Sequence, residues 1–386
     1  MPSSPRPPVC CDLFCAVIDN YGDAAVCWRL ARQLAAEHGW QVRLLIDDPE
    51  PLGPLSGRPM AGRQVLGPGI VEVRPWDAGV RYEQAAVVVE AFACALPAAY
   101  EEAMARAART PLWINLDYLS AEDWVESCHL QTSPHPRLPL RKTFFFPGFT
   151  ARTGGLLREA GLFAAREAHR RAPWWRTRGL PEVPEGACVV SLFAYENPAL
   201  DCLLDVWREA SQPVVALVPT SRISPGVARY FGSSRWQPGQ SLQAGALSVH
   251  ALPFTDQEGY DRLLWSCDFN FVRGEDSLVR AQWAARPFCW HIYAQEDAAH
   301  LVKLDALLDR YHTGLPDEDA AALRTLWHAW NGAPHAASGP AQLARAWAQL
   351  RARPDAWCEH ATAWAARLGM QRDLCTNLVE FVEERL

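Results

Sequence analysis

The sequence predicts an α/β protein built from two Rossmann-like domains. Apolar strand patterns alternate with amphipathic helix patterns in both halves of the chain, which is typical of parallel sheets covered by helices. A proline-rich stretch without periodicity, residues 172–186, separates the two halves. Because 386 residues exceed the size of one typical core, we expect one domain over residues 1–175, a second over 187–367, and a last helix, about 368–386, that crosses back to the first.

The first half has strand patterns around one clear helix. That helix is expected over residues 24–38, with Val26, Leu30 and Leu34 near one face and Gly39 at its end. One strand precedes it and another follows it directly. The strands are expected at residues 12–18, 41–46, 71–74, 86–89 and 112–115. Together these elements predict a doubly wound N-terminal domain.

The second half repeats the alternation after the proline-rich stretch. Its strands are expected at residues 188–193, 213–218, 247–252, 268–272 and 288–292. The tail from about residue 361 to 386 has a mostly helical pattern. The glycine pair Gly154 and Gly155, within the first domain, is typical of either a hinge over a site or an ordinary turn.

Composition and charge exclude several classes of function. A formal net charge of −7 without a stripe of Lys and Arg argues against a nucleic-acid partner. The 12 cysteines form no C-x-x-C pair, so buried free thiols in a reducing cytoplasm are expected. No run reaches the roughly 18 apolar residues of a membrane span, and the histidines form no H-x-x-x-H pair. We therefore expect a cytoplasmic protein without a zinc site.

Two acids follow the first strand, in the segment that leads into the first helix. Ligands of open α/β sheets collect at the carboxyl ends of strands, and Asp19 and Asp23 lie there. Asp23 could simply cap the helix, but capping does not require Asp19 as well. Two carboxylates beside a crevice suggest work on a cation or a proton.

The stretch from Cys267 to Ala285 changes from a strand pattern to a helix pattern across one polar turn. The turn reads Arg273-Gly274-Glu275-Asp276-Ser277. A strand that feeds a helix through such a turn directs backbone N–H groups and the positive end of the helix dipole at one spot, which suits a phosphate. The alternative is purely structural: Asp276 or Ser277 caps the helix and Arg273 pairs with Glu275.

A further set of residues is suited to a nucleotide base. Phe254 and Gln257 lie where a strand leads into a helix, so a ring and an amide could stack a base and contact its edge. Thr255 and Glu258 have the spacing of a capping box. Phe193 and Tyr195, at and just beyond a strand end, could line the same crevice, although Phe193 could equally belong to the core.

Three segments carry a family resemblance. DLFCAVIDNYGDAAVCWRLARQL, FFFPGFTARTGGLL and PFTDQEGYDRLLWSCDFNFVRGEDSLVRAQWAARPFCWHIYAQEDAAHLVKLDALL resemble the EarP family, bacterial protein-arginine rhamnosyltransferases that modify elongation factor P. The resemblance covers nearly the whole chain in order. It implies the GT-B arrangement, two Rossmann-like domains facing a cleft. It also implies the donor dTDP-β-L-rhamnose, an arginine of elongation factor P as acceptor, inversion at the anomeric carbon, and no metal or cofactor.

Residue roles follow from this resemblance. Asp23 matches the general base of the family, Asp19 its neighbour in the acceptor site, and Glu275 a third required acid. The positions that match the nucleotide-sugar site are Phe193, Tyr195, Phe254, Gln257, Arg273, Asp276 and Ser277, with Tyr293 in HIYAQE as an addition.

Two other functions remain open at this stage. The same fold could use another nucleotide sugar and a small-molecule acceptor. A protein without catalytic activity could also keep the nucleotide crevice only to recognise a partner. Preferential stabilisation by dTDP-sugars or by UDP-sugars distinguishes the first alternative. The acids distinguish the second, because an adaptor does not depend on them.

Overall fold

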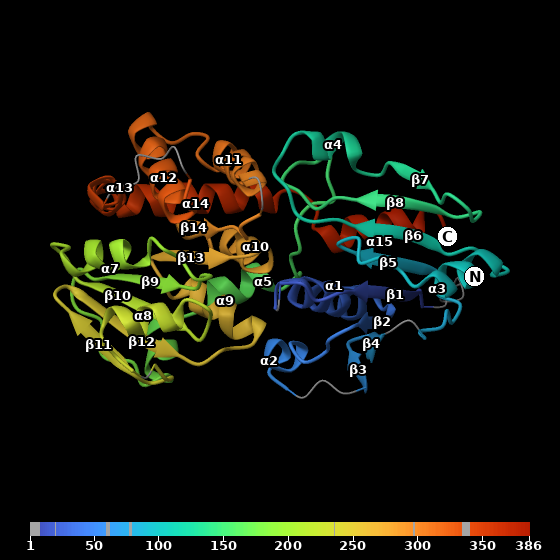
Figure 1. Ribbon diagram of the computed structural model, residues 1–386, viewed down its shortest axis with the longest axis horizontal. Helices are drawn as coiled ribbons and strands as arrows, with labels where there is room; N and C mark the ends of the chain where they lie inside the picture. Colours follow the sequence, from blue (N-terminus) through green and yellow to red (C-terminus); the bar gives the residue numbers. More distant parts are fainter. Residues whose placement is uncertain are drawn as a thin grey trace. The chain divides into compact units, whose positions relative to one another are not determined.

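The computed structural model describes residues 8–19, 21–58, 62–76, 79–234, 236–295, 298–333 and 340–386. The chain divides into two compact units, Met1–Leu162 with Gly369–Leu386, and Phe163–Leu368. Figure 1 shows that each unit contains a sheet flanked by helices. Each unit is therefore a layered α/β structure, in agreement with the predicted fold class.

The first unit contains an eight-stranded sheet with the order β3-β4-β2-β1-β5-β6-β8-β7. The six inner strands are parallel, whereas β3 and β7 pair antiparallel at the two edges. The strands are β1 (Cys10–Cys15), β2 (Gln41–Ile46), β3 (Gly62–Leu66), β4 (Gly69–Pro75), β5 (Val87–Ala91), β6 (Leu112–Leu116), β7 (Thr132–Pro134) and β8 (Arg141–Phe145). The chain order reverses between β1 and β5, and such a switch point opens a crevice at the carboxyl ends of the strands.

The last helix of the chain belongs to this first unit. It packs beside α1, and the side-chain amide of Gln33 donates to Asp373 over 3.0 Å. Asp373 caps it by accepting the backbone N–H groups of Cys375 and Thr376. The helices of the unit are α1 (Gly22–His38), α2 (Leu52–Ser56), α3 (Ala98–Arg106), α4 (Trp124–Cys128) and α15 (Leu374–Glu383).

Close packing requires glycine at positions 154 and 155. A Cβ atom on Gly154 would lie 2.5 Å from the Phe145 ring. Gly155 has a φ of +82°, and a Cβ there would lie 2.6 Å from the carbonyl oxygen of Arg372. Asn377 of α15 also donates to the Gly154 carbonyl over 2.9 Å. The pair therefore lets the chain pass close to the C-terminal segment.

The second unit contains a six-stranded sheet with the order β11-β12-β10-β9-β13-β14. All its pairs are parallel except β11 with β12. The strands are β9 (Cys188–Leu192), β10 (Val214–Pro219), β11 (Ser241–Ala244), β12 (Leu247–Leu252), β13 (Phe269–Arg273) and β14 (Phe288–His291). Here the switch point lies between β9 and β13.

A buried ion pair joins two neighbouring helices of this unit, α9 and α10. Arg280 donates from Nε and from one terminal nitrogen to the two carboxylate oxygens of Asp261, each over 2.7 Å, and both residues are almost fully buried. The remaining helices of the chain are α5 (Leu162–Ala168), α6 (Arg171–Arg176), α7 (Leu200–Arg208), α8 (Ser224–Tyr230), α9 (Gln257–Trp265), α10 (Asp276–Ala284), α11 (Ala299–Tyr311), α12 (Asp317–Trp330), α13 (Pro340–Ala352) and α14 (Pro354–Gly369).

The capping box expected at the start of α9 is wrong, because the N-cap residue lies one position later than Thr255. The cap is Asp256, whose carboxylate accepts the backbone N–H of Gly259 over 2.7 Å. Thr255 precedes the cap, and its hydroxyl oxygen would lie 1.9 Å from a Cβ on Gly259. Asp256, with β-region backbone, thus binds the N–H of Gly259, one residue beyond the N–H of Glu258 that a cap at Thr255 would bind.

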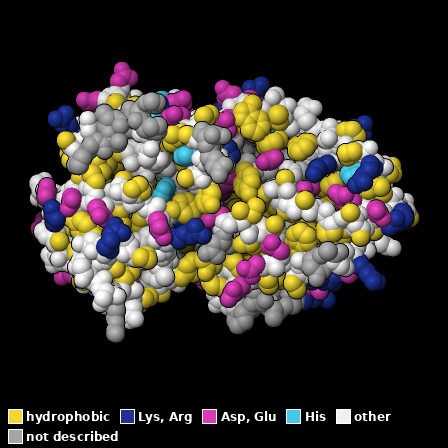
Figure 2. All heavy atoms as spheres, in the orientation of Figure 1, with side chains coloured by type: hydrophobic (Ala, Val, Ile, Leu, Met, Phe, Trp, Pro, Cys, Tyr) yellow, Lys and Arg dark blue, Asp and Glu magenta, His cyan; other side chains and the backbone are white. Residues whose placement is uncertain are grey.

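The surface shows no strong charge segregation on the face drawn in Figure 2, where Lys and Arg are interspersed with Asp and Glu. All 12 cysteines are free thiols. In the described ranges, no helix is long and apolar enough to cross a membrane. Among these same residues, no three His, Cys, Asp or Glu side chains gather as a metal site.

Candidate functional site

In the first unit, Asp23 binds back to the loop after β1. Its Oδ2 accepts the backbone N–H groups of Ile18 and Asp19, each over 2.9 Å. The alternative that Asp23 caps the helix is wrong: α1 begins at Gly22, and Tyr21 is at the N-cap position and makes no side-chain cap bond. Asp23 therefore fixes the loop that carries Asp19, and only 5% of Asp23 is exposed.

The two predicted acids of this unit lie together. The backbone N–H of Gly22 donates to the carbonyl of Asp19 over 2.6 Å. A Cβ at Gly22 would lie only 2.9 Å from a carboxylate oxygen of Asp19, so that carboxylate lies against the start of α1. Asn20, between them in the motif, lies outside the described residues. The glycine in this motif thus allows both acids to share one helix start.

The environment of Asp23 makes its carboxylate a stronger base than an ordinary aspartate. Burial raises the pKa of Asp23 above its usual value, and the negative charges of Asp19 and Asp47 add to this. The N–H groups of Asp19 and Ile18 oppose the increase without cancelling it. A raised pKa favours uptake of a proton from a donor held nearby.

Asp47 is a further acid that the sequence analysis did not single out. It follows β2 directly, and its Oδ1 accepts the backbone N–H of Val17 over 2.9 Å. Together with Asp23, it binds the N–H groups of residues 17–19. Its position immediately after a strand was the available signal.

In the second unit, Arg273 lies between two aromatic rings. Its guanidinium carbon is 4.8 Å from the centroid of Phe193 and 4.7 Å from that of Tyr195. Phe193 and Tyr195 follow β9 and Arg273 ends β13, so the three residues meet at the switch point of this sheet. Only 6% of Arg273 is exposed, which strengthens the cation–π contacts.

The turn after β13 is closed by Ser277. Its hydroxyl accepts the backbone N–H of Arg273 over 3.1 Å and donates to the carbonyl of the same residue. The alternative that Asp276 or Ser277 caps α10 is wrong, since Glu275 occupies the cap position and makes no side-chain cap bond. Gly274 has a φ of +62°, which reverses the chain between Arg273 and Glu275.

The first turn of α10 is therefore oriented toward the switch point. Its leading N–H groups have no acceptor within the helix, and they follow directly on the buried Arg273. A helix start beside a guanidinium suits a phosphate. The structure thus brings together Arg273, Glu275, Asp276 and Ser277 around one turn.

Two residues that the sequence analysis missed complete the aromatic surroundings. The ring centroid of Tyr260 in α9 lies 5.3 Å from that of Phe193. Burial raises the pKa of Tyr260, and the Ser277 hydroxyl opposes that rise. The ring centroids of His291 and Tyr195 lie 5.3 Å apart. Burial, and to a smaller extent the positive charge of Arg273, lowers the pKa of His291 to about 4. His291 is therefore neutral near pH 7.

The remaining predicted residues lie at the margins of this group. Tyr293 is 50% exposed, and its ring is 5.5 Å from Tyr195. Gln257 is buried at the start of α9, the helix that also carries Tyr260, and Phe254 lies just before that helix. The location of Phe254 and Gln257 is thus compatible with a base beside Phe193.

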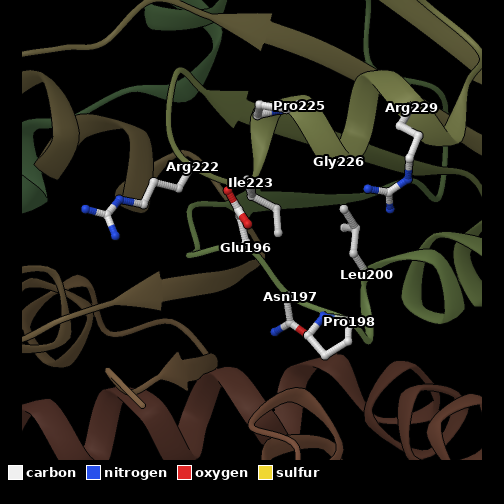
Figure 3. Close-up of a pocket in the computed structure, with 9 residues that line it drawn as sticks. All are labelled: Glu196, Asn197, Pro198, Leu200, Arg222, Ile223, Pro225, Gly226 and Arg229. Carbon is white, nitrogen blue, oxygen red and sulfur yellow. The ribbon is translucent and has the colours of Figure 1, made fainter. Parts of the chain in front are cut away.

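A pocket of about 700 Å³ lies next to this group, between the loops that follow β9 and β10. Figure 3 shows Arg222 and Arg229 on opposite sides, with Glu196, Ile223 and Leu200 between them. None of the predicted site residues lines it. Its Glu196 follows Tyr195 directly, so the pocket shares a loop with the aromatic group.

Comparison with known proteins gives one consistent result. Residues 11–383 match the family model described as elongation-factor P (EF-P) rhamnosyltransferase EarP. A protein-arginine rhamnosyltransferase of Pseudomonas putida is 49% identical over 97% of this chain and 99% of its own length. One from Neisseria meningitidis serogroup B is 35% identical over 98% of each.

Solved structures agree with the family match. A structure described as the structural basis for EarP-mediated arginine glycosylation of translation elongation factor EF-P superposes with a TM-score of 0.68 at 37% identity, covering 98% of this chain and 99% of that one. MurG of Acinetobacter baumannii superposes with a TM-score of 0.51 at 11% identity, covering 98% of this chain and 100% of that one. The MurG likeness shows the GT-B fold alone.

Proposed function

The chain belongs to the EarP family of elongation-factor P rhamnosyltransferases, and on this premise we propose how it transfers rhamnose to an arginine side chain of elongation factor P. The enzyme is a protein-arginine rhamnosyltransferase. In our proposal the donor is dTDP-β-L-rhamnose, the reaction inverts the anomeric carbon, and the enzyme needs no metal. An acceptor that serves translation places the reaction in the cytoplasm.

One observation carries the donor half of this proposal. The buried guanidinium of Arg273 lies between Phe193 and Tyr195 at the switch point of the second unit, beside the start of α10. A guanidinium and a helix start together bind a diphosphate, and the aromatic residues suit a base. Charge that develops on the departing dTDP would be stabilised there without a metal.

The acids of the first unit supply what an arginine nucleophile requires. A guanidinium has a pKa above about 12, so removing its proton near pH ~7 costs at least about 7 kcal/mol in water. Asp19 and Asp23 would accept its N–H groups and orient one nitrogen. Asp23, whose pKa is raised by burial, would take the proton as the carbon–nitrogen bond forms and the carbon–oxygen bond to dTDP breaks.

Mass spectrometry tests the reaction directly. Elongation factor P incubated with this enzyme and dTDP-β-L-rhamnose should gain one deoxyhexose on an arginine, and no gain should occur without the donor. The anomeric signals of the glycopeptide in NMR should show the α configuration if the β donor is inverted. An unmodified acceptor contradicts the function, and a β-linked product contradicts inversion alone.

Ligand-induced stabilisation tests the nucleotide. Binding to the folded state raises the melting temperature, so dTDP and dTDP-sugars should stabilise the enzyme more than UDP-sugars at equal concentration. A stronger response to a UDP-sugar would favour the alternative donor. Chelation of divalent metals should leave the transfer rate unchanged, and a lost rate would contradict metal independence.

A further inference from the structure

A second loop lies beside the acidic loop of the first unit. Strands β1 and β5 are parallel neighbours in which Phe14 is opposite Glu90, so the loops that follow them leave the same edge of the sheet. The backbone of Ala16 lies within hydrogen-bonding reach of the Cys94 sulfur. The segment of residues 92–96, which we name the β5 loop, thus flanks the switch point where Asp19 and Asp23 lie.

The β5 loop has an unusual backbone. Phe92, Ala93 and Ala95 have φ values of +56°, +52° and +55°, although none of them is glycine. Side chains with a Cβ rarely adopt this left-handed region, and for a bulky residue such as phenylalanine it is a clear outlier. Strained backbone of this kind concentrates at functional sites and persists only where the surroundings enforce it.

The surroundings of the β5 loop do enforce it. Buried Glu90 accepts the backbone N–H of Ala95 at Oε1 over 3.2 Å. Its Oε2 accepts from the Trp113 indole over 3.1 Å and from the Lys142 ammonium over 2.9 Å. At the other end of the loop, the backbone N–H of Phe92 donates to the carbonyl of Leu116 over 2.7 Å. The conformation is therefore fixed on both sides.

The start of the loop carries an aromatic stack. The rings of Phe92 and Tyr118 have centroids 4.5 Å apart and planes inclined by 18°. Tyr118 follows β6, which is the next strand beyond β5. Aromatic faces attract guanidinium groups and also pack against the methylene groups of arginine.

We propose that the β5 loop, with the stacked rings of Phe92 and Tyr118, forms a second wall of the acceptor site and positions the arginine of the acceptor protein against Asp19 and Asp23. The inference rests on the proposed function, because it takes a protein arginine as the substrate. The strained backbone of the β5 loop holds the ring of Phe92 in its stacked position against Tyr118. Glu90 is a positioning residue, since it acts through the loop.

Relaxing the strain tests this role. Glycine adopts positive φ without strain, so Ala93→Gly and Ala95→Gly should leave folding intact while freeing the loop. We expect the KM for elongation factor P to rise roughly fivefold to thirtyfold, as for loss of a guanidinium–aromatic contact. The KM for the donor and the kcat at saturating acceptor should stay within about twofold.

The chain offers a matched control. Gln84 has a φ of +52° in the same unit, but it precedes β5 and so lies toward the opposite edge of the sheet from the β5 loop. Gln84→Gly relieves the same backbone strain away from the acids, and the KM for the acceptor should not change. A second set tests the wall itself: Phe92→Leu should raise the KM for the acceptor and Phe92→Tyr should restore it.

The results distinguish a failure of the proposed role of the β5 loop from a failure of the proposed function. If the wild-type enzyme transfers rhamnose and both glycine variants keep its KM for the acceptor, the β5 loop does not position arginine. The same conclusion follows if Gln84→Gly raises this KM as much as Ala93→Gly does. If the wild-type enzyme transfers nothing to elongation factor P, the proposed function fails first and the inference fails with it.

Discussion

Oδ2 of Asp23 accepts the backbone N–H of Asp19 over 2.9 Å, so one predicted acid holds the loop that carries the other. The two carboxylates are therefore one structural unit with two roles. Oδ2 of Asp23 is already bound to the loop, so proton transfer to Asp23 would use its other oxygen. This arrangement sets the design of the first two predictions.

Asp23→Asn should lower kcat by roughly a hundredfold to ten-thousandfold, the range typical of a lost general base. The amide oxygen can still accept the N–H groups of Ile18 and Asp19, so the loop should keep its place. The affinity for the donor, measured by calorimetry, should stay unchanged. Asp47→Asn is the matched control, because it changes a carboxylate that holds Val17 in the same loop. Unchanged turnover in Asp23→Asn would show that Asp23 is not the general base.

The acid limb of the pH–rate profile should reflect the raised pKa of Asp23. The base must be ionised, so activity is present above this pKa and is lost as pH falls through it. Because burial raises the pKa from 3.8, the loss should begin at a higher pH than for an ordinary aspartate. The dependence of kcat on pH in the presence of saturating donor and acceptor measures it. A profile that stays flat down to the usual aspartate pKa would contradict this assignment.

Arg273→Gln should weaken binding of dTDP by roughly tenfold to a hundredfold, since a charge-assisted contact to the diphosphate is lost. Arg273→Lys should recover only part of this affinity, because an ammonium cannot replace the planar guanidinium between Phe193 and Tyr195. Titration calorimetry gives the dissociation constants. Arg222→Gln, in the neighbouring pocket, is the control and should keep the affinity of the wild type. Equal losses in both variants would mean a general effect of positive charge.

Breaking the buried ion pair should destabilise the second unit. Asp261→Asn leaves the Arg280 charge buried without its carboxylate, which costs about 3–5 kcal/mol in the free energy of unfolding. The double variant Asp261→Leu with Arg280→Met should recover most of this loss. Glu258→Gln, which removes an exposed pair on the same helix, should cost less than about 1 kcal/mol. Urea denaturation distinguishes the three, and equal costs for the buried and exposed pairs would be the contrary result.

His291→Phe should make the enzyme less sensitive to acid. The pKa of His291 is lowered from 6.5 to about 4, so its stabilising contribution is present above pH 6.5 and is lost as pH falls toward 4. A phenyl ring preserves the contact with Tyr195 but cannot take up a proton. Melting temperatures measured across this pH range should fall more steeply for the wild type than for the variant. Parallel curves would show that His291 does not titrate there.

The sequence predicts the parallel core of both units well. The strands expected at residues 41–46 and 247–252 are β2 and β12 with the same limits, and the others agree within a few residues. These strands are continuous apolar runs, which is the pattern of strands buried on both faces. The edge strands β3, β7 and β11 were not predicted, because they are short, polar and paired antiparallel. Each of these edge strands forms by pairing with another strand, which the residue pattern of the short segment itself does not indicate. The parallel strand β8 was not predicted either.

Some residues of the candidate site could be predicted from the sequence and others could not. Asp19, Asp23 and Arg273 follow or end buried strands, so their position at the carboxyl edge could be inferred from the order of elements alone. Tyr260 and the β5 loop could not be found in this way. The ring of Tyr260 reaches Phe193 from a different helix, and the strain at Phe92 depends on backbone angles that the residue types do not indicate.

The return of α15 to the first unit has a consequence for biosynthesis. The acidic loop and α1 are made early, but the contacts of Gln33 with Asp373 and of Gly154 with Asn377 form only after residues 373–377 have been synthesised. The N-terminal unit therefore cannot complete its packing until this late segment has left the ribosome, whereas the middle of the polypeptide can fold sooner. A chain truncated before residue 374 would lack α15 and leave exposed the face of α1 that this helix covers.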